Sequence, residues 1–399
     1  MVTRLLPLRA VAALTAVPLV LTACSAPAPR TASAPPPEVS VAQSDSVTPM
    51  AGPVPAPAAP APPFCGDVAA LSTRDKLAQT LMVGVRNAAD ARAVVNNYHV
   101  GGIMIGSWTD LSMLTDGTLA EIGNLGPLPL AVSVDEEGGR VSRLAPLIGA
   151  IPPARTLAQT QTPEQVYQLA LSRGRQMRGL GITIDFAPVV DVSDQGANTV
   201  IGDRSFSNDP ATVTAYAGAF ARGLREAGVL PVLKHFPGHG HGSGDSHTAG
   251  VVSTPPLSEL MTSDLVPYAT LTSEAPVAVM MGHLEVPGLT GNTPASLSAA
   301  AVNLLRSGGY GGPAFNGPIF SDDLSSMAAI SSRYGVAEAV LRSLQAGTDV
   351  ALWITTTEVP AVLDRLEKAV NGGELALPAI EGSVLRMAGI KGPSARCGG

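Results

Sequence analysis

Short apolar runs alternate with longer amphipathic segments from residue 81 almost to the end of the chain. Eight of the runs are only four to seven residues long, the usual length of a buried strand. They cover residues 81–85, 102–105, 128–134, 182–187, 229–234, 277–281, 318–321 and 350–354. Between them, apolar positions repeat with helical spacing over residues 163–180, 211–227, 337–346 and 360–370. This alternation predicts βα units around a parallel sheet.

Eight such units fit an α/β fold of the (β/α)8 TIM-barrel type, with a single catalytic domain. The competing architecture is a doubly wound open sheet, but no Gly-x-Gly-x-x-Gly turn follows the first predicted strand. Polar residues follow five of the strands, namely Asp135, Asp191, His235, His283 and Asp322. The sequence therefore predicts a barrel whose site lies at the carboxyl ends of its strands.

The first 23 residues have the pattern of a signal peptide. Arg4 and Arg9 precede an apolar run, residues 10–21, that is shorter than the roughly 20 residues a membrane-spanning helix needs. The run leads into LTAC, a lipobox that ends at Cys24. We expect cleavage before Cys24 and lipidation of its thiol, so that the protein is exported and anchored on the extracytoplasmic face of the cell membrane. The alternative is an ordinary leader with an accidental cysteine.

Residues 24–63 form a predicted linker, and residues 64–399 form the predicted barrel domain. The linker consists mainly of Ala, Pro, Ser and Val, and an extended Pro-rich tether of this length reaches on the order of 100 Å. Cys65 and Cys397 lie close to the two ends of the domain. In an oxidising compartment we expect a disulfide between them, and two unpaired thiols are the alternative.

Charge and composition restrict the possible partners. The formal net charge is −7, and the sequence contains no basic run that could neutralise phosphates. Because an acidic chain repels a polyanion, nucleic acid is not an expected partner. With 399 residues and 45% hydrophobic content, the chain can bury a large core. We expect a monomer that contacts the membrane only through its lipid anchor.

The segment most informative about chemistry is residues 234–247, KHFPGHGHGSGDSH, which holds four of the six histidines of the chain. Its many glycines predict a mobile loop after the fifth strand. Asp245 lies two residues before His247, so its carboxylate can hold one imidazole nitrogen and raise the basicity of the other. His247 is therefore a candidate general acid/base.

A zinc site is the strongest rival interpretation of this loop. However, neither a His-Glu-x-x-His helix nor a paired-cysteine motif accompanies it. A solvated surface loop is the remaining alternative.

A second segment, residues 319–324, IFSDDL, takes an apolar strand directly into two carboxylates. An ionised aspartate beneath a sugar ring can attack the anomeric carbon and form a covalent glycosyl intermediate. The alternative is helix capping. We expect Asp322 to face the barrel mouth and Asp323 to bond the backbone.

Charged residues also crowd the rim after the third strand. Residues 135–143, DEEGGRVSR, begin with Asp135 and end with Arg143, and Arg204 lies in a separate GDRSF segment. A carboxylate and a guanidinium together can hold vicinal hydroxyls or a substrate carboxylate. Internal ion pairs would explain either segment about as well, so the residues alone leave both interpretations open.

Together these motifs resemble glycoside hydrolase family 3, and within it the single-domain bacterial β-N-acetylglucosaminidases of the NagZ type. KHFPGHG with DSH at residues 245–247, VDxEGGRVxR at 134–143, GDRSF at 202–206 and SDDL at 321–324 occur in the order of that family. The similarity covers roughly residues 71–387, the whole predicted barrel.

The resemblance implies that Asp322 is the nucleophile and that Asp245 and His247 form the acid/base pair. It also implies that five residues hold the first sugar, namely Asp135, Arg143, Arg204, Lys234 and His235. Enzymes of this kind cleave N-acetylglucosaminyl-β-1,4-N-acetylmuramic acid fragments of peptidoglycan by a retaining mechanism. They need no metal or other cofactor.

Two features depart from the cytoplasmic members of the family. Glu136 stands where histidine is common, which we expect to alter the rim but not the chemistry. The lipobox and linker indicate the exported actinobacterial lipoprotein form, which acts on wall fragments outside the membrane. Three alternatives remain: a phosphorylase, in which phosphate replaces water, a lipid-anchored protein that only binds wall sugars, and a metal-dependent hydrolase that uses the histidine loop.

Overall fold

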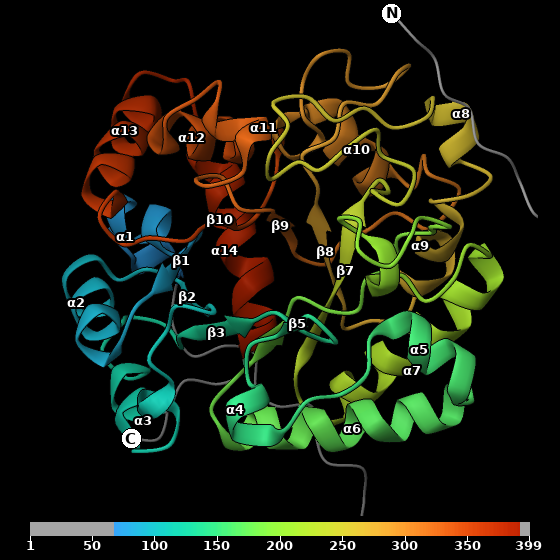
Figure 1. Cartoon of the computed structure of the whole chain (residues 1–399). Coiled ribbons are helices and arrows are strands. Elements are labelled where there is room, and N and C mark those ends of the chain that lie inside the picture. Colours follow the sequence, from blue (N-terminus) through green and yellow to red (C-terminus); the bar gives the residue numbers. More distant parts are fainter. Residues whose placement is uncertain (1–67, 392–399) are drawn as a thin grey trace, which may run out of the picture. The chain divides into compact units, whose positions relative to one another are not determined.

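The computed structural model describes residues 68–391. The predicted signal peptide and linker, together with Cys24, Cys65 and Cys397, lie outside the described residues. Eight strands form one parallel sheet with the order β10-β1-β2-β3-β6-β7-β8-β9. A parallel bridge between Phe320 and Val350 joins the two ends of this order, so the sheet closes into a barrel surrounded by helices (Figure 1). The predicted (β/α)8 fold is confirmed.

The strands of the barrel are short, and one small hairpin accompanies them. The barrel strands are β1 (Leu81–Val85), β2 (Gly102–Ile105), β3 (Ala131–Val134), β6 (Ile184–Asp185), β7 (Leu230–Phe236), β8 (Ala278–Met281), β9 (Ile319–Ser321) and β10 (Ala351–Trp353). Directly after β3, β4 (Glu136–Gly138) pairs antiparallel with β5 (Val141–Ser142). This hairpin is absent from the sequence prediction.

The helices fill the connections between the strands. The α-helices are α1 (Thr73–Ala78), α2 (Ala88–Tyr98), α3 (Thr118–Ile122), α4 (Ala145–Ile148), α5 (Ala154–Thr160), α6 (Pro163–Gly179), α7 (Pro210–Glu226), α8 (Leu257–Leu260), α9 (Val266–Leu271), α10 (Ala299–Ser307), α11 (Ala328–Ser331), α12 (Val336–Ala346), α13 (Val359–Asn371) and α14 (Leu377–Lys391). Short 3-10 turns cover Val68–Ala70, Leu111–Leu114, Gly202–Arg204 and Ala295–Leu297. Within residues 68–391, no helix combines the length and apolar character needed to cross a bilayer.

Local sequence explains where the long helices begin. Thr162 caps α6 in a reciprocal capping box with Gln165, and Pro163 occupies the first turn. Asp209 caps α7 by accepting the backbone N–H of Thr212, and Pro210 again occupies the first turn. Gly223 lets α6 and α7 approach closely, because a side chain there would meet the Tyr167 carbonyl oxygen at 2.6 Å.

Six of the eight strand predictions differ from the structure in their bounds, and β6 and β7 are two examples. β6 covers only Ile184–Asp185, although residues 182–187 were predicted. The flanking residues still bond to β3, since the N–H groups of Thr183 and Phe186 donate to the carbonyls of Val132 and Val134. Pairing resumes as a single bridge between Val189 and Lys234. β7 extends to Phe236, two residues beyond its predicted end.

The barrel interior is apolar and rich in methionine. The interior cluster includes Met82, Met104, Phe186, Met280, Phe320, Leu352 and, from α14, Met387. Helix α14 therefore covers the amino ends of the strands, where Lys391 Nζ also donates to the Gly101 carbonyl at 2.7 Å. Figure 1 shows this helix inside the ring of outer helices. The carboxyl ends of the strands are left open to form a site.

Candidate active site

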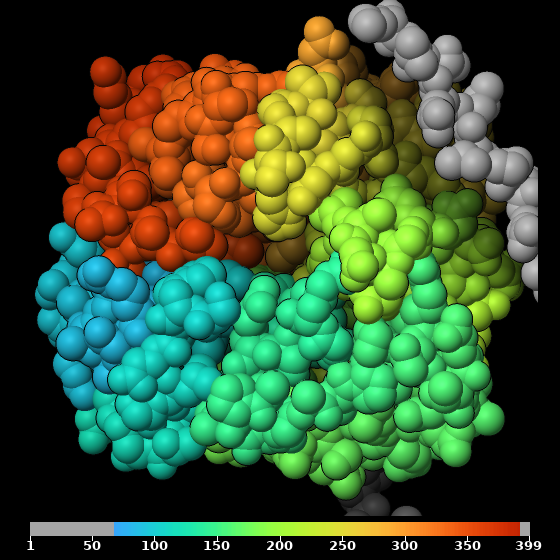
Figure 2. Space-filling model, viewed as in Figure 1, coloured from blue at the N-terminus to red at the C-terminus, as the bar shows by residue number. Residues whose placement is uncertain are grey.

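A cavity of about 480 Å³ lies at the carboxyl ends of the strands. Figure 2 shows the surface of this face hollowed where the cyan, green, yellow and orange segments meet. All eight residues that the sequence predicted for catalysis or sugar binding line this cavity, namely Asp135, Arg143, Arg204, Lys234, His235, Asp245, His247 and Asp322. The structure therefore brings together side chains that are up to 187 positions apart in the chain.

Asp322 and Asp323 follow β9 and face different partners. The carboxylate of Asp322 lines the cavity and accepts one backbone hydrogen bond, from the N–H of Asp323 at 2.8 Å. The carboxylate of Asp323 instead accepts the backbone N–H groups of Ser325 at 2.9 Å and Ser326 at 3.1 Å. Asp323 thus holds the turn after the strand, while Asp322 remains available to a ligand. The short helix after this turn is α11, Ala328–Ser331.

The environment of Asp322 keeps its carboxylate ionised. Burial opposes the charge, but the nearby imidazoles of His283 and His235, with the N–H of Asp323, outweigh it and lower the pKa of Asp322 to about 2. A carboxylate that is charged at neutral pH and accepts few hydrogen bonds is suited to nucleophilic attack.

His283, at the end of β8, supports this turn from behind. Its side chain is buried, and Nε2 donates to the Asp323 carbonyl oxygen at 2.7 Å while Nδ1 lies 2.7 Å from Ser296 Oγ. Burial lowers the pKa of His283. The sequence placed His283 after the sixth strand but assigned it no role, and its contacts indicate that it fixes the backbone beside Asp322.

The Asp245–His247 pair lies on the loop after β7. Asp245 Oδ1 is 2.7 Å from His247 Nδ1 and accepts the His247 backbone N–H at 2.9 Å. These bonds to His247 outweigh burial and lower the pKa of Asp245. The His247 side chain is 57% exposed, so Nε2 is open to the cavity and to solvent. An imidazole held in this way by a carboxylate can pass a proton at Nε2.

The loop that carries His247 is docked against α11. The carbonyl oxygens of Ser246 and His247 accept the N–H groups of Ala329 at 3.2 Å and Ala328 at 3.3 Å. At its base, Gly240 packs so tightly that an added side chain would meet the Val192 carbonyl oxygen at 1.9 Å. The structure thus holds the loop with His247 at the same cavity as Asp322.

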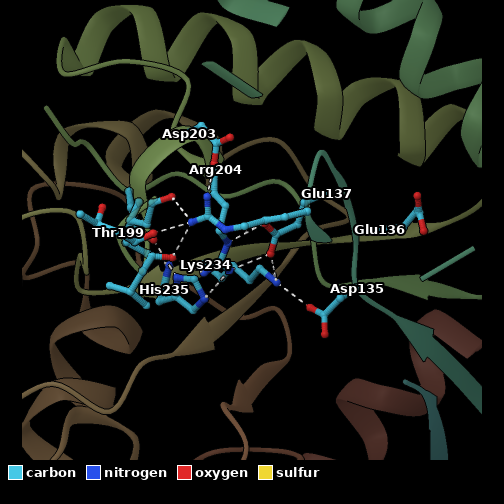
Figure 3. Close-up of polar contacts among 12 residues, drawn as sticks. Asp135, Glu136, Glu137, Thr199, Asp203, Arg204, Lys234 and His235 are labelled. Atoms are coloured by element: carbon cyan, nitrogen blue, oxygen red, sulfur yellow. Dashed lines mark hydrogen bonds and ion pairs between the residues drawn. The ribbon is translucent and has the colours of Figure 1, made fainter. Parts of the chain in front are cut away.

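A network of ion pairs also lines the cavity (Figure 3). Lys234 Nζ lies 2.6 Å from both Asp135 Oδ1 and Glu137 Oε1. Arg204 binds Glu137 with two parallel bonds of 2.8 Å. Burial of Glu137 is outweighed by these two cations, so its pKa is lowered. Glu137 thereby fixes the two cations that line the cavity, a role that the sequence did not assign.

His235 is oriented by a buried carboxylate. Its Nδ1 lies 2.7 Å from Asp191 Oδ2, while Asp191 Oδ1 accepts the backbone N–H of His239 at 2.7 Å. With Nδ1–H donated to Asp191, Nε2 faces the guanidinium of Arg204 at 3.5 Å. Burial opposes the charge of Asp191, but His235 and His239 outweigh it and lower the pKa of the Asp191 carboxyl. The sequence placed Asp191 after a strand without recognising it as the partner of His235.

Arg143 and Glu136 differ in how they relate to the cavity. Within residues 68–391, the guanidinium of Arg143 has no protein partner, so it can bind a ligand. Glu136 was expected to shape the rim, and this expectation is wrong. Its carboxylate is buried, pairs with Arg173 and accepts the Leu144 N–H at 2.7 Å, and Figure 3 shows it directed away from the network.

The histidines of the glycine-rich loop bind separate partners. His235 contacts Asp191, His239 lies 3.2 Å from Ser246 Oγ, and His241 Nδ1 lies 2.9 Å from Asp264 Oδ2. In the part of the chain that the structure describes, no three His, Cys, Asp or Glu side chains are grouped to hold a metal ion. The geometry of the loop therefore favours separate Asp–His pairs over a metal-ligand cluster.

Comparisons with known proteins identify the family of this chain. Residues 72–390 match the model of the glycosyl hydrolase family 3 N terminal domain. The chain is 68% identical over 360 residues to the β-hexosaminidase LpqI of Mycobacterium tuberculosis, which covers 88% of this chain and 92% of that protein. The solved structure of that LpqI has a TM-score of 0.82 and covers 85% of this chain and all of its own.

A more distant solved structure belongs to the same family. The family 3 β-N-acetylglucosaminidase from Paenibacillus sp. str. FPU-7 is 32% identical, with a TM-score of 0.75, and the match covers 81% of this chain and 62% of that one. The (β/α)8 barrel and the match to the family model over almost all of the described residues identify a glycoside hydrolase. The chain belongs to glycoside hydrolase family 3, and it is a β-N-acetylhexosaminidase that acts on a carbohydrate substrate.

Proposed function

We propose that this enzyme removes terminal β-linked N-acetylglucosamine from peptidoglycan fragments by a retaining, two-step mechanism. One observation carries the proposal: the charged carboxylate of Asp322 and the Asp245–His247 pair line the same cavity. A carboxylate that attacks and a separate group that moves a proton are the two requirements of retaining hydrolysis.

In the first step, an oxygen of Asp322 attacks the anomeric carbon, and the bond from that carbon to the leaving oxygen breaks. The leaving oxygen takes the electron pair of that bond and a proton from Nε2 of His247. Asp245 stabilises the imidazolium that supplies the proton, since it already accepts a bond from Nδ1. The product of this step is a glycosyl ester on Asp322.

In the second step, water hydrolyses the glycosyl ester. Nε2 of His247 takes a proton from the water, whose oxygen bonds to the anomeric carbon as the bond to Asp322 breaks. The carboxylate is regenerated, and two inversions leave the sugar with its original β configuration. No metal ion enters either step.

The polar side of the cavity is suited to hold the sugar during both steps. Asp135, Lys234 and His235 present fixed hydrogen-bonding groups from the ends of β3 and β7. Arg204 is held by Glu137, and Arg143 has a guanidinium open to the cavity. Groups positioned by their own ion pairs lose little freedom when they bind hydroxyls or an acetamido group.

The reaction is tested by incubating the protein with defined N-acetylglucosaminyl-β-1,4-N-acetylmuramic acid fragments and identifying the products. We expect free N-acetylglucosamine. Asp322→Asn should lower kcat by on the order of 10⁴-fold. Asp323→Asn is the matched control, because it removes the charge of a neighbouring carboxylate that also lines the cavity but is bonded to the turn, and it should keep most of the activity. A fully active Asp322→Asn variant would exclude Asp322 as the nucleophile.

Phosphorolysis is the second candidate for the same site. A neutral imidazole adds no negative charge that would repel phosphate, so phosphate could replace water in the second step. The same incubation with inorganic phosphate distinguishes the two reactions. We expect no sugar 1-phosphate, and its appearance as the main product would identify a phosphorylase.

We also propose that the enzyme is exported and held to the membrane through lipidated Cys24, with the disulfide Cys65–Cys397 closing the domain. The lipobox and the Ala/Pro-rich linker support this location. Cys24→Ser should move the protein from the membrane fraction to the soluble fraction. Peptide mapping without reductant should recover residues Cys65 and Cys397 in one linked species, and free thiols at both would refute the disulfide.

A further inference from the structure

Trp108 is a large aromatic side chain at the mouth of the cavity with no role in the proposed chemistry. It lines the cavity and is 40% exposed. Within residues 68–391, its indole N–H has no protein partner. The only other tryptophan in the chain, Trp353, is fully buried. An exposed tryptophan beside a sugar-binding cavity provides a flat apolar surface for a ligand.

The turn that carries Trp108 is firmly held. Thr109 Oγ1 accepts the Gly106 N–H at 3.0 Å and donates to the Val85 carbonyl at 2.6 Å. The Trp108 ring packs over Gly106, where an added side chain would lie 2.4 Å from ring carbons. The indole is therefore fixed in orientation by the turn below it, and ligand binding costs little side-chain entropy.

Exposure places Trp108 on the outer part of the cavity, where the leaving group extends. The groups proposed to hold the first sugar follow β3, β6 and β7, while Asp322 follows β9. Trp108 follows β2, the neighbour of β3 in the barrel. Lys234 and His235 are only 2% and 6% exposed, whereas Trp108 is 40% exposed. A terminal sugar held by the buried groups therefore extends its aglycone outward, toward the mouth where Trp108 lies.

A second partly exposed apolar residue lines the cavity. Ile354, directly after β10, also lines the cavity and is only partly buried. Charged residues at the cavity follow mainly β3, β6 and β7, whereas Trp108 and Ile354 follow β2 and β10. The cavity therefore has a polar part for one sugar and an apolar part next to it.

We propose that Trp108 is the platform of a second subsite, which binds the ring of the sugar on the leaving-group side. This inference rests on the proposed function, because it takes Asp322 as the point of cleavage. One face of a β-linked pyranose carries C–H groups with partial positive charge, which match the negative face of an indole. The natural substrate class is then a glycan of at least two sugars.

Kinetics with two donors of the same N-acetylglucosaminyl group test the subsite. One donor is N,N′-diacetylchitobiose, whose leaving group is a sugar, and the other is β-N-acetylglucosaminyl fluoride, whose leaving group is too small to reach Trp108. Trp108→Ala should lower kcat/KM for the disaccharide about tenfold, equivalent to about 1.4 kcal/mol. It should leave the fluoride reaction unchanged, and Trp108→Phe should retain part of the disaccharide activity.

Leu147→Ala is the control, because Leu147 is similarly exposed at 37% but lies outside the cavity. It should change neither reaction. The subsite would be overturned if Trp108→Ala lowered kcat/KM equally for both donors, or lowered it for neither. If the wild-type enzyme turned over neither donor, the proposed function itself would fail, which is a different outcome.

Fluorescence gives an independent test, since Trp108 is the exposed one of two tryptophans. In the Asp322→Asn protein, diacetylchitobiose should shift the tryptophan emission, whereas N-acetylglucosamine alone should shift it little. The shift should disappear when Trp108→Phe is added. A shift that persists without Trp108 would come from Trp353 and would refute stacking on the indole.

Discussion

Asp322 and Asp323 show how two identical side chains, adjacent in the chain, take different roles. Asp323 is occupied by Ser325 and Ser326, whereas, among the described residues, the only hydrogen bond to the Asp322 carboxylate comes from the backbone N–H of Asp323. The sequence predicted this division from the position after a strand, since one of two carboxylates in such a turn normally binds the backbone. It gave no basis for the low pKa of Asp322, which depends on imidazoles from β7 and β8.

The pKa of Asp322 predicts how the first step depends on pH. A carboxylate with a pKa of about 2 stays ionised above that pH and loses its charge only as the pH falls through it. With β-N-acetylglucosaminyl fluoride, whose leaving group needs no proton, the first-step rate should stay constant from about pH 7 to about pH 4. Stopped-flow measurement of fluoride release checks this. A decline centred within that range would mean that another group attacks.

His247 and His241 lie on one loop and give a second prediction. Both pair with a carboxylate, but only His247 lines the cavity. His247→Ala should lower the rate on diacetylchitobiose by about 10²–10⁴-fold, the usual contribution of a general acid. The first-step rate with the fluoride donor should change far less. His241→Gln should affect both only slightly, and a comparable loss in this control would point to a loop effect.

Sequence reasoning found the residues that meet a ligand better than those that hold them. The former lie in short motifs with recognisable spacing. Glu137 and Asp191 were missed because their roles depend on partners far along the chain, such as Arg204, which lies 67 residues after Glu137. Trp108 was missed because a single aromatic residue in a loop has no pattern. Only folding reveals that it stands at the cavity.

At the scale of elements, apolar patterning located the barrel strands well but not their ends or additions. β1 and β2 have the predicted bounds, because uninterrupted apolar residues fill them. The β4–β5 hairpin was missed because its residues are charged or small. Helix α14 was missed because Gly382 and Gly389 weaken its helical pattern, and tertiary packing overrides that propensity.

The loop after β7 allows a prediction about an element. Gly240→Ala would force the loop away from the Val192 carbonyl, which lies 1.9 Å from the added carbon. Because this moves His247, we expect kcat on diacetylchitobiose to fall at least about tenfold. Gly244→Ala, on the same loop, meets only the Ala249 side chain at 4.0 Å and should be nearly neutral. Equal activity of the two variants would show that the loop position does not limit the reaction.

At the scale of the whole molecule, helix α14 closes the barrel at the amino ends of the strands, and the cavity opens at their carboxyl ends. The Met387 side chain from α14 packs into the barrel interior, and buried Asp349 bonds Ser383 and Arg386 of the same helix. Because α14 acts at the amino ends of the strands, it should support stability without touching the site. The closed eight-stranded order was predictable from the sequence, whereas the helix that fills its lower end was not.

Stability measurements test whether α14 supports folding without affecting the site. Met387→Ala should lower the free energy of unfolding by about 2–5 kcal/mol, as expected for a buried side chain truncated in a packed core. Its kcat below the unfolding temperature should equal that of the wild type. Leu385→Ala, on the same helix but 56% exposed, should change stability by less than about 0.5 kcal/mol. Urea unfolding followed by circular dichroism provides both values.

The central claim is that Asp322 forms a covalent bond with the sugar. It is tested most directly by trapping the intermediate with a slow 5-fluoro-N-acetylglucosaminyl fluoride and locating the adduct by peptide mass spectrometry. The account predicts one fluorinated N-acetylglucosaminyl adduct on the peptide that contains Asp322, absent from Asp322→Asn. An adduct on another carboxylate, or no adduct together with release of the α-anomer from a normal substrate, would contradict it.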